Sequence, residues 1–139
     1  MSGRIAVVIA DDHSAFRLAL LRVIDAAPDM TVVAAVGDGA SALDAIRRLV
    51  PAVAVLDIRM PWLDGIDVAR RLVEDQQDTR IVIATLHWNR ETIQRAVAAG
   101  VSGFLSKETA LSDVVEAVRA VASGQTYIAP ALADSWASH

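Results

Sequence analysis

Runs of apolar residues alternate along the chain with segments in which apolar residues recur every three or four positions. The apolar runs predict strands from Ile5 to Ala10, Thr31 to Val36, Val53 to Leu56, Arg80 to Thr85 and Gly103 to Leu105. The first and fourth runs are apolar almost throughout, which is typical of strands buried on both faces of a parallel sheet. Half-exposed strands would instead alternate between apolar and polar residues.

The segments between and after these runs have the period of amphipathic helices. The clearest one places Leu111, Val114, Val115, Val118 and Val121 on a single face. Strand and helix alternate five times with short connections, and neighbouring parallel strands require helical crossovers of this length. The pattern therefore predicts an α/β fold: a doubly wound, five-stranded parallel sheet with helices on both faces.

Composition narrows the function classes. The 139 residues fit one domain, and 54% hydrophobic with 22% charged residues is typical of a globular chain and not of a disordered one. A net charge of −4 gives little attraction to nucleic-acid phosphates or anionic lipid. We therefore expect no direct nucleic-acid binding by this chain.

The absence of cysteine and the two ends of the chain add expectations about the cellular compartment and about the segment after the last predicted helix. With no cysteine, disulfides and thiolate metal sites are excluded, and a reducing compartment is favoured, so we expect a cytoplasmic protein. The first apolar run meets Asp11 and Asp12 too early for a signal peptide or a membrane span of about 20 residues, so no membrane association is expected. After Gly124 the chain reads as a trailing segment, in which Pro130 argues against a long helix and Trp136 either packs back or lies free.

Ionisable and hydroxyl side chains stand at the carboxyl ends of four predicted strands. Asp11 and Asp12 end the first strand, Asp57 the third, Thr85 the fourth and Lys107 the fifth. In an open α/β sheet, ligands bind at this edge, near the point where the strand order reverses. Each residue alone has a plainer explanation, such as a helix cap for Asp12 or a solvated side chain for Lys107, but their joint placement argues against coincidence.

Three neighbouring carboxylates require a cation, because they repel by roughly 4 kcal/mol per pair at about 4 Å and an effective dielectric near 20. The ligands are oxygens, which favours Mg²⁺, with Mn²⁺ as a substitute. Such a site suits phosphoryl chemistry: Asp57 attacks a phosphoryl donor, Lys107 neutralises the transferred oxygens and Thr85 donates its hydroxyl. His13 and His87 border the site without the spacing of a metal-ligand pair, so we interpret both as solvated loop residues.

Four stretches, "IADDH", "LDIRMPWLDG", "IATLH" and "GVSGFLSKE", resemble in this order the receiver domains of bacterial two-component response regulators, a family with the flavodoxin-like fold. The likeness covers about residues 4 to 123. The resemblance implies that Asp57 is the phosphoacceptor and that Asp12, Asp57 and the backbone carbonyl of Arg59 ligate Mg²⁺. It also implies that Asp11 acts through a bound water and that Lys107 bridges to the phosphorylated aspartate.

The family's switch has counterparts here as well. The resemblance implies that Thr85 moves toward the phosphoryl group and that Phe104 turns inward into the space that Thr85 leaves. This change would remodel the surface of the fourth helix, fifth strand and fifth helix and so control dimerisation. Glu108 follows Lys107 where many receivers have proline, and this feature together with "DIRMP" looks like the NarL/FixJ-type, LuxR-related branch. Phe104 stands where tyrosine is frequent, so a switch role that needs a hydroxyl is absent.

The same resemblance implies a signalling role and a division of the chain. We expect a receiver domain over residues 1–124 and, over 125–139, a tail or the start of a linker to an output domain. Regulators of this branch usually carry a helix-turn-helix DNA-binding domain there; the chain is either a fragment of such a transcriptional regulator or a stand-alone receiver. The expected partners are a sensor histidine kinase and, after phosphorylation, a second copy of the chain. No enzyme activity is expected beyond assisting its own phosphorylation and slow dephosphorylation at Asp57.

Two other functions compete with this interpretation. A Mg²⁺-dependent phosphatase that forms an aspartyl-phosphate commonly has a second acid two residues after the nucleophile, but Arg59 stands there. An interaction module that no longer uses phosphate is disfavoured by the intact acidic set. A dinucleotide-binding domain is excluded because no G-x-G-x-x-G follows the first strand. Trp62 and Trp88 fall in loops near the site, and we expect both to be partly buried.

Overall fold

The structure, a computed structural model, describes residues 3–137. The strands are β1 (Ile5–Ala10), β2 (Met30–Val36), β3 (Val53–Leu56), β4 (Arg80–Thr85), β5 (Gly103–Ser106) and β6 (Tyr127–Ile128). The helices are α1 (Ser14–Asp25), α2 (Gly39–Leu49), α3 (Gly65–Glu74), α4 (Arg90–Ala98), α5 (Ala110–Ala122), the 3₁₀ helix η1 (Pro130–Leu132) and α6 (Ala133–Ala137).

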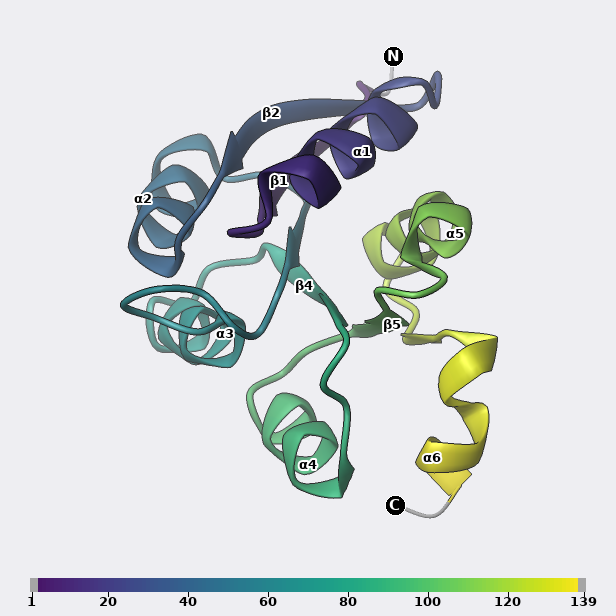
Figure 1. Cartoon of the computed structure of the whole chain (residues 1–139). Coiled ribbons are helices and arrows are strands. Elements are labelled where there is room, and N and C mark those ends of the chain that lie inside the picture. The colour runs from purple at the N-terminus through teal and green to yellow at the C-terminus, as the bar shows by residue number, and fades with distance from the viewer. Residues whose placement is uncertain (1–2, 138–139) are drawn as a thin grey trace.

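The strands form a parallel sheet in the order β2-β1-β3-β4-β5-β6. Figure 1 shows α1 and α5 on one face of this sheet and α2, α3 and α4 on the other. The predicted doubly wound α/β fold is therefore confirmed. The strand order reverses between β1 and β3, so the carboxyl ends of these two strands flank the crevice in which such folds bind ligands.

The apolar runs are buried because helices cover both faces of the strands, as their composition indicated. Val7, Val8 and Ile9 of β1 have no exposed surface, and every residue of β3 is buried. These strands have helices on both faces, so neither face can be polar. In register, Ala10 of β1 pairs with Leu56 of β3, and the next residue on each strand is an aspartate. The pairing places the two carboxylates side by side at the edge.

A sixth strand was not expected. The Tyr127 amide donates to the Ser102 carbonyl at 2.9 Å, and the Ala129 amide donates to the Phe104 carbonyl at 2.9 Å. These bonds pair the short β6 with β5. They satisfy backbone groups at the outer edge of β5 that would otherwise face water.

The segment after residue 124 continues along this edge as far as the structure describes it. As Pro130 indicated, no long helix forms there: η1 has 3 residues and α6 has 5. Trp136 packs back, with its ring centroid 4.6 Å from that of Phe104. Residues 138 and 139 lie outside the described part of the chain, and the division at residue 124 stays a prediction. Among residues 3–137, no helix has both the length and the apolar character needed to cross a membrane.

Candidate functional site

A buried ion triad lies at the carboxyl end of the sheet. The Lys107 ammonium is 2.8 Å from Oδ2 of Asp11 and 2.8 Å from Oδ2 of Asp57. The side chains of Lys107, Asp11 and Asp57 are 7%, 2% and 5% exposed. The predicted convergence of these three residues is confirmed, and the lysine lies between two acids that would otherwise repel each other.

The charge state of Lys107 follows from two opposing effects. Burial disfavours the ammonium, but hydrogen bonds and charge attraction from Asp11 and Asp57 outweigh burial, and the pKa of Lys107 is raised above its usual value. Lys107 therefore remains a cation at neutral pH. The Lys107 amide also donates to the Thr85 carbonyl at 3.0 Å, so β4 fixes the backbone from which the ammonium extends.

Asp12 and His13 complete the acidic end of the site. The ligand atoms of Asp11, Asp12, His13 and Asp57 all lie within 4.8 Å of one another, a spacing that one metal ion can bridge. Asp12 is partly exposed, with a side chain 41% accessible. The carboxylates therefore fit a hard divalent cation that keeps part of its water shell.

His13 takes part more closely than the sequence indicated. Its side chain is 68% exposed, as expected for a loop residue, but its Nδ1 lies 3.1 Å from the Lys107 ammonium. The same Nδ1 lies 3.5 Å from Oδ1 of Asp11 and 3.7 Å from Oδ1 of Asp12. The His13 amide donates to Oδ1 of Asp11 at 2.9 Å. His13 thus helps to hold the triad, which its spacing from other ligands did not reveal.

Both oxygens of Asp57 are engaged. Oδ1 accepts from the Ile58 amide at 2.7 Å and Oδ2 contacts Lys107. The Asp57 carbonyl lies against Gly65, the first residue of α3, so closely that a Cβ on Gly65 would overlap it. The start of α3 is therefore packed tightly against the backbone of Asp57.

Thr85 and Phe104 are both buried next to this site, at 0% and 1% exposure. The Thr85 hydroxyl accepts from the His87 amide at 3.3 Å, so it is bonded to its own loop. Phe104 lies between two tryptophans: its centroid is 5.6 Å from that of Trp88 and 4.6 Å from that of Trp136. The two proposed switch residues are thus held on adjacent strands, β4 and β5.

Three aromatic positions show where sequence reasoning stopped. Phe16 on α1 lies under the ammonium of Lys107, 4.8 Å from ring centroid to Nζ, a cation–π contact that only the fold creates. Trp88 is half-buried as expected, and its Nε1 donates to the Leu105 carbonyl at 2.8 Å. The expectation for Trp62 was wrong. Trp62 is 87% exposed and has a positive φ of 75°.

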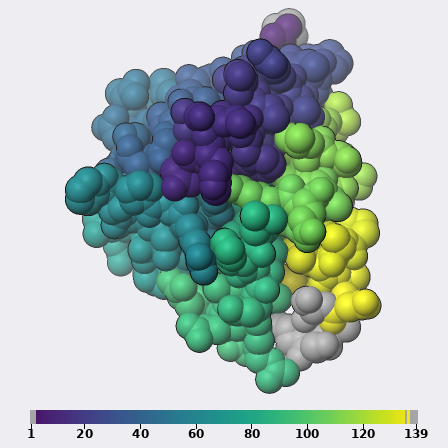
Figure 2. Space-filling model, viewed as in Figure 1, coloured from purple at the N-terminus to yellow at the C-terminus, as the bar shows by residue number. Residues whose placement is uncertain are grey.

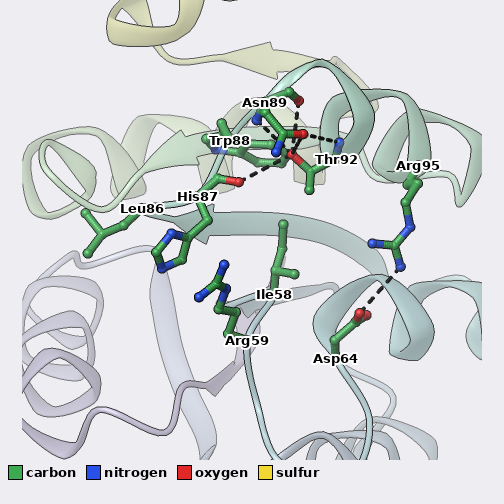
Figure 3. A pocket seen from close by; sticks show the side chains of 9 residues that line it. All are labelled: Ile58, Arg59, Asp64, Leu86, His87, Trp88, Asn89, Thr92 and Arg95. Carbon is green, nitrogen blue, oxygen red and sulfur yellow. Dashed lines mark hydrogen bonds and ion pairs between the residues drawn. The ribbon is translucent and has the colours of Figure 1, made fainter.

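Two cavities open at this edge. One, of about 290 Å³, lies over the carboxylates and is lined by Asp12, His13, Asp57, Arg59, Leu86, His87 and Lys107. The other, of about 540 Å³, lies beside it and shares Arg59, Leu86 and His87. Figure 3 shows the Arg59 and His87 side chains pointing toward one another, while Arg95 reaches Asp64 across the far end at 3.5 Å. The buried carboxylate of Asp57 is therefore accessible from solvent through a hollow bordered by Arg59 and His87.

Residues 7–119 match the family model of the response regulator receiver domain. The chain belongs to this family. Receiver domains of response regulators are signalling domains and not classical enzymes. The buried carboxylates and lysine described above therefore lie in a signalling domain.

Relatives place this receiver domain in the NarL-type, LuxR-related branch. It is 33% identical over 128 residues to the transcriptional regulatory protein DegU of Brevibacillus brevis, covering 92% of this chain and 54% of DegU. It superimposes on the signal receiver domain of NarL from Mycobacterium tuberculosis with a TM-score of 0.86 and 34% identity, over 89% of this chain and 100% of that one. For a LuxR-family two-component response regulator from Aurantimonas sp. SI85-9A1, the TM-score is 0.91 at 28% identity, over 98% and 97% of the chains. The receiver domain thus spans about half the length of DegU.

Proposed function

We propose that this receiver domain is a phosphorylation-dependent switch in which Asp57 accepts the phosphoryl group of a sensor histidine kinase. The observation that carries the proposal is the ion triad. A buried carboxylate, held by Lys107 at 2.8 Å and open to a cavity of about 290 Å³, has both a nucleophilic oxygen and a nearby cation for the transferred group. A purely structural ion pair has no need of a solvent-filled opening.

The transfer is a displacement at phosphorus. An oxygen of Asp57 attacks the phosphorus of a phosphohistidine, the new O–P bond forms as the P–N bond breaks, and the imidazole of the kinase leaves with the electron pair. Lys107 already contacts Asp57, so its ammonium is placed to neutralise the oxygens of the incoming group. The product is an acyl phosphate, which water hydrolyses slowly. No other enzyme activity is proposed.

The donor set supports a Mg²⁺ ion as cofactor. Asp12, Asp57 and the backbone carbonyl of Arg59 would hold it directly, and Asp11 would act through a bound water. Bound Mg²⁺ supplies positive charge to the phosphoryl oxygens. The oxygen ligands suit this hard cation better than the imidazole of His13 does.

The switch proposal rests on Thr85 and Phe104. A phosphoryl group on Asp57 adds acceptor oxygens. The Thr85 hydroxyl, which accepts a hydrogen bond from the His87 amide, would move toward that group and donate its proton to a phosphoryl oxygen. Phe104 would then turn into the space that Thr85 leaves. Phosphorylation would thereby shift the population between two packings and favour a homodimer.

The wider role is also a proposal. A receiver of this branch in the cytoplasm would control transcription through a helix-turn-helix domain outside this chain, and the relative DegU is named as a transcriptional regulator. The receiver itself would not contact nucleic acid, because its net charge is −4.

The test is incubation with Mg²⁺ and a small phosphodonor such as phosphoramidate, followed by intact-mass measurement. One phosphoryl group should appear in the wild type and in Asp44→Asn, which alters an exposed carboxylate of α2, and none in Asp57→Asn. Modification that persists in Asp57→Asn would refute the assignment. Rapid multiple turnover of phosphate esters would instead support a phosphatase, and dimerisation that phosphorylation leaves unchanged would support a phosphate-independent module.

A further inference from the structure

Three aromatic rings form a row that leads from the β4–α4 loop to the last described helix. The centroids of Trp88 and Phe104 are 5.6 Å apart, and those of Phe104 and Trp136 are 4.6 Å apart with an interplanar angle of 61°. Edge-to-face pairs at such distances are favourable beyond the area that they bury. We call Trp88, Phe104 and Trp136 the aromatic row.

The first end of the aromatic row is connected to the phosphorylation site. The Thr85 hydroxyl accepts from the His87 amide at 3.3 Å, and Trp88 is the next residue along the chain. The Trp88 indole is fixed in turn by its hydrogen bond to the Leu105 carbonyl at 2.8 Å. If Thr85 moves toward a phosphoryl group on Asp57, its hydroxyl draws away from the His87 amide, and the loop that positions Trp88 loses one of its hydrogen bonds.

The other end is connected to the C-terminal segment, residues 127–137. The Ala129 amide donates to the Phe104 carbonyl at 2.9 Å, and Leu132 of η1 is buried at 6% exposure. Trp136 adds its ring against the Phe104 side chain. Figure 2 shows this segment, in yellow, packed against the light green residues of α5. Phe104 therefore contacts the C-terminal segment with both its backbone and its side chain.

We propose that the aromatic row couples the docking of residues 127–137 to the state of Asp57. When Phe104 turns inward, its ring withdraws from the edge of Trp136, and α6 loosens from the edge of β5. This inference rests on the proposed phosphorylation switch and adds a route by which the switch reaches the carboxyl end of the chain. The C-terminal segment thus belongs to the signalling mechanism and is more than a passive connection.

Linkage gives the proposal a measurable consequence. If phosphorylation weakens the contact between Trp136 and Phe104, then removing that contact must favour the phosphorylated state by the same factor. Trp136→Ala in the full chain should therefore bind the phosphoryl analogue beryllofluoride, in the presence of Mg²⁺, about two- to tenfold more tightly than wild type, the range that an edge-to-face aromatic pair supplies.

The experiment combines this affinity with a direct signal from the ring. The full chain is labelled with fluorotryptophan, each resonance is assigned by Trp→Phe substitution, and beryllofluoride with Mg²⁺ is titrated in. The Trp136 resonance should shift with the same midpoint as binding at Asp57. Trp136→Phe keeps a ring beside Phe104 and should restore most of the wild-type affinity. Ile24→Val thins the core on α1, where Ile24 is buried, and should leave the affinity unchanged, which separates coupling from general loss of stability.

The outcomes separate this inference from the proposed function. Beryllofluoride binding that is lost in Asp57→Asn, yet equal in wild type and Trp136→Ala, would overturn the coupling and leave the switch intact. So would a Trp136 resonance that does not move. Binding that is absent in the wild type, or unaffected by Asp57→Asn, would overturn both. Tighter binding by Trp136→Ala but not by Ile24→Val would support the coupling.

Discussion

Replacing Lys107 by methionine removes a buried positive charge while keeping a side chain of similar length. In the wild type, the ammonium lies 2.8 Å from Asp11 and 2.8 Å from Asp57. Without it, two carboxylates with side-chain exposures of only 2% and 5% face each other inside the protein. We expect Lys107→Met to be less stable than wild type, by an amount that depends on the metal ion.

The magnitude comes from opposing terms. At 2.8 Å and an effective dielectric near 20, each ion pair attracts by about 6 kcal/mol, and removing the ammonium from water costs several kcal/mol in return. Removing one partner of a buried pair typically destabilises by about 3–5 kcal/mol, because the remaining charge is left uncompensated. A domain in the upper part of the ordinary stability range of about 5–15 kcal/mol remains folded after such a loss.

The assay is urea unfolding in EDTA and again in excess Mg²⁺. In EDTA, Lys107→Met should lose about 3–5 kcal/mol, whereas Arg70→Met, which breaks the exposed pair of Arg70 with Asp67, should lose ~0.5 kcal/mol or less. Mg²⁺ at a hundredfold the wild-type dissociation constant adds about 2.7 kcal/mol to the wild type. The ion should stabilise Lys107→Met more than wild type, because ammonium and metal neutralise the same carboxylates.

Two results would refute this reasoning. If Lys107→Met were within about 0.5 kcal/mol of wild type in EDTA, the triad would contribute no more than a surface ion pair. If Mg²⁺ stabilised both proteins equally, the ion and the ammonium would not share their carboxylates. Either result would also weaken the case that Lys107 neutralises a group on Asp57.

Three further changes test close packing, a side-chain hydrogen bond and a helix cap. Gly65→Ala should lose at least about 2 kcal/mol in urea unfolding and impair phosphorylation by a small donor, because its Cβ would overlap the carbonyl of the proposed phosphoacceptor. Trp88→Phe keeps a ring but loses the hydrogen bond to the Leu105 carbonyl, and the same assay should show a loss of about 1 kcal/mol. Asp38→Asn should flatten the acid side of the stability–pH curve. The Ser41 amide and hydroxyl lower the pKa of Asp38, so its contribution is present above the ordinary value of 3.8 and lost as pH falls through the folded value.

The sheet could be predicted because its signal is local. A run such as Ile5–Ala10 is apolar on both faces, and Val7 to Ala10 within it are buried, as is typical of a parallel sheet covered by helices. The strand β6 carries no such signal. It has 2 residues, and it exists because the edge of β5 offers the Ser102 and Phe104 carbonyls to the Tyr127 and Ala129 amides. Two residues are too few to show a strand pattern, so the pairing of β6 with β5 could not be read from the sequence.

The same distinction applies to the site. Asp11 and Asp57 could be placed together because each follows a strand end, and aligned parallel strands bring their ends to one edge. The contact of Phe16 with Lys107 could not be predicted. An apolar residue on α1 gives the same sequence signal whether its ring faces the core or an ammonium. Trp62 was misjudged because an aromatic residue in a loop has the same sequence signal whether it packs on the domain or, as here, is 87% exposed.

Charge balance sharpens the argument for a divalent ion. The repulsion among the carboxylates predicted a cation, and the structure shows that Lys107 already provides one for Asp11 and Asp57. With Asp12 the three acids carry −3, Lys107 carries +1, and a charge of −2 remains at a cluster whose ligand atoms lie within 4.8 Å. A single divalent cation matches that remainder, whereas a monovalent ion leaves an uncompensated charge. A phosphoryl group on Asp57 makes the site more negative still. The proposed site should therefore bind Mg²⁺ more tightly after transfer than before it.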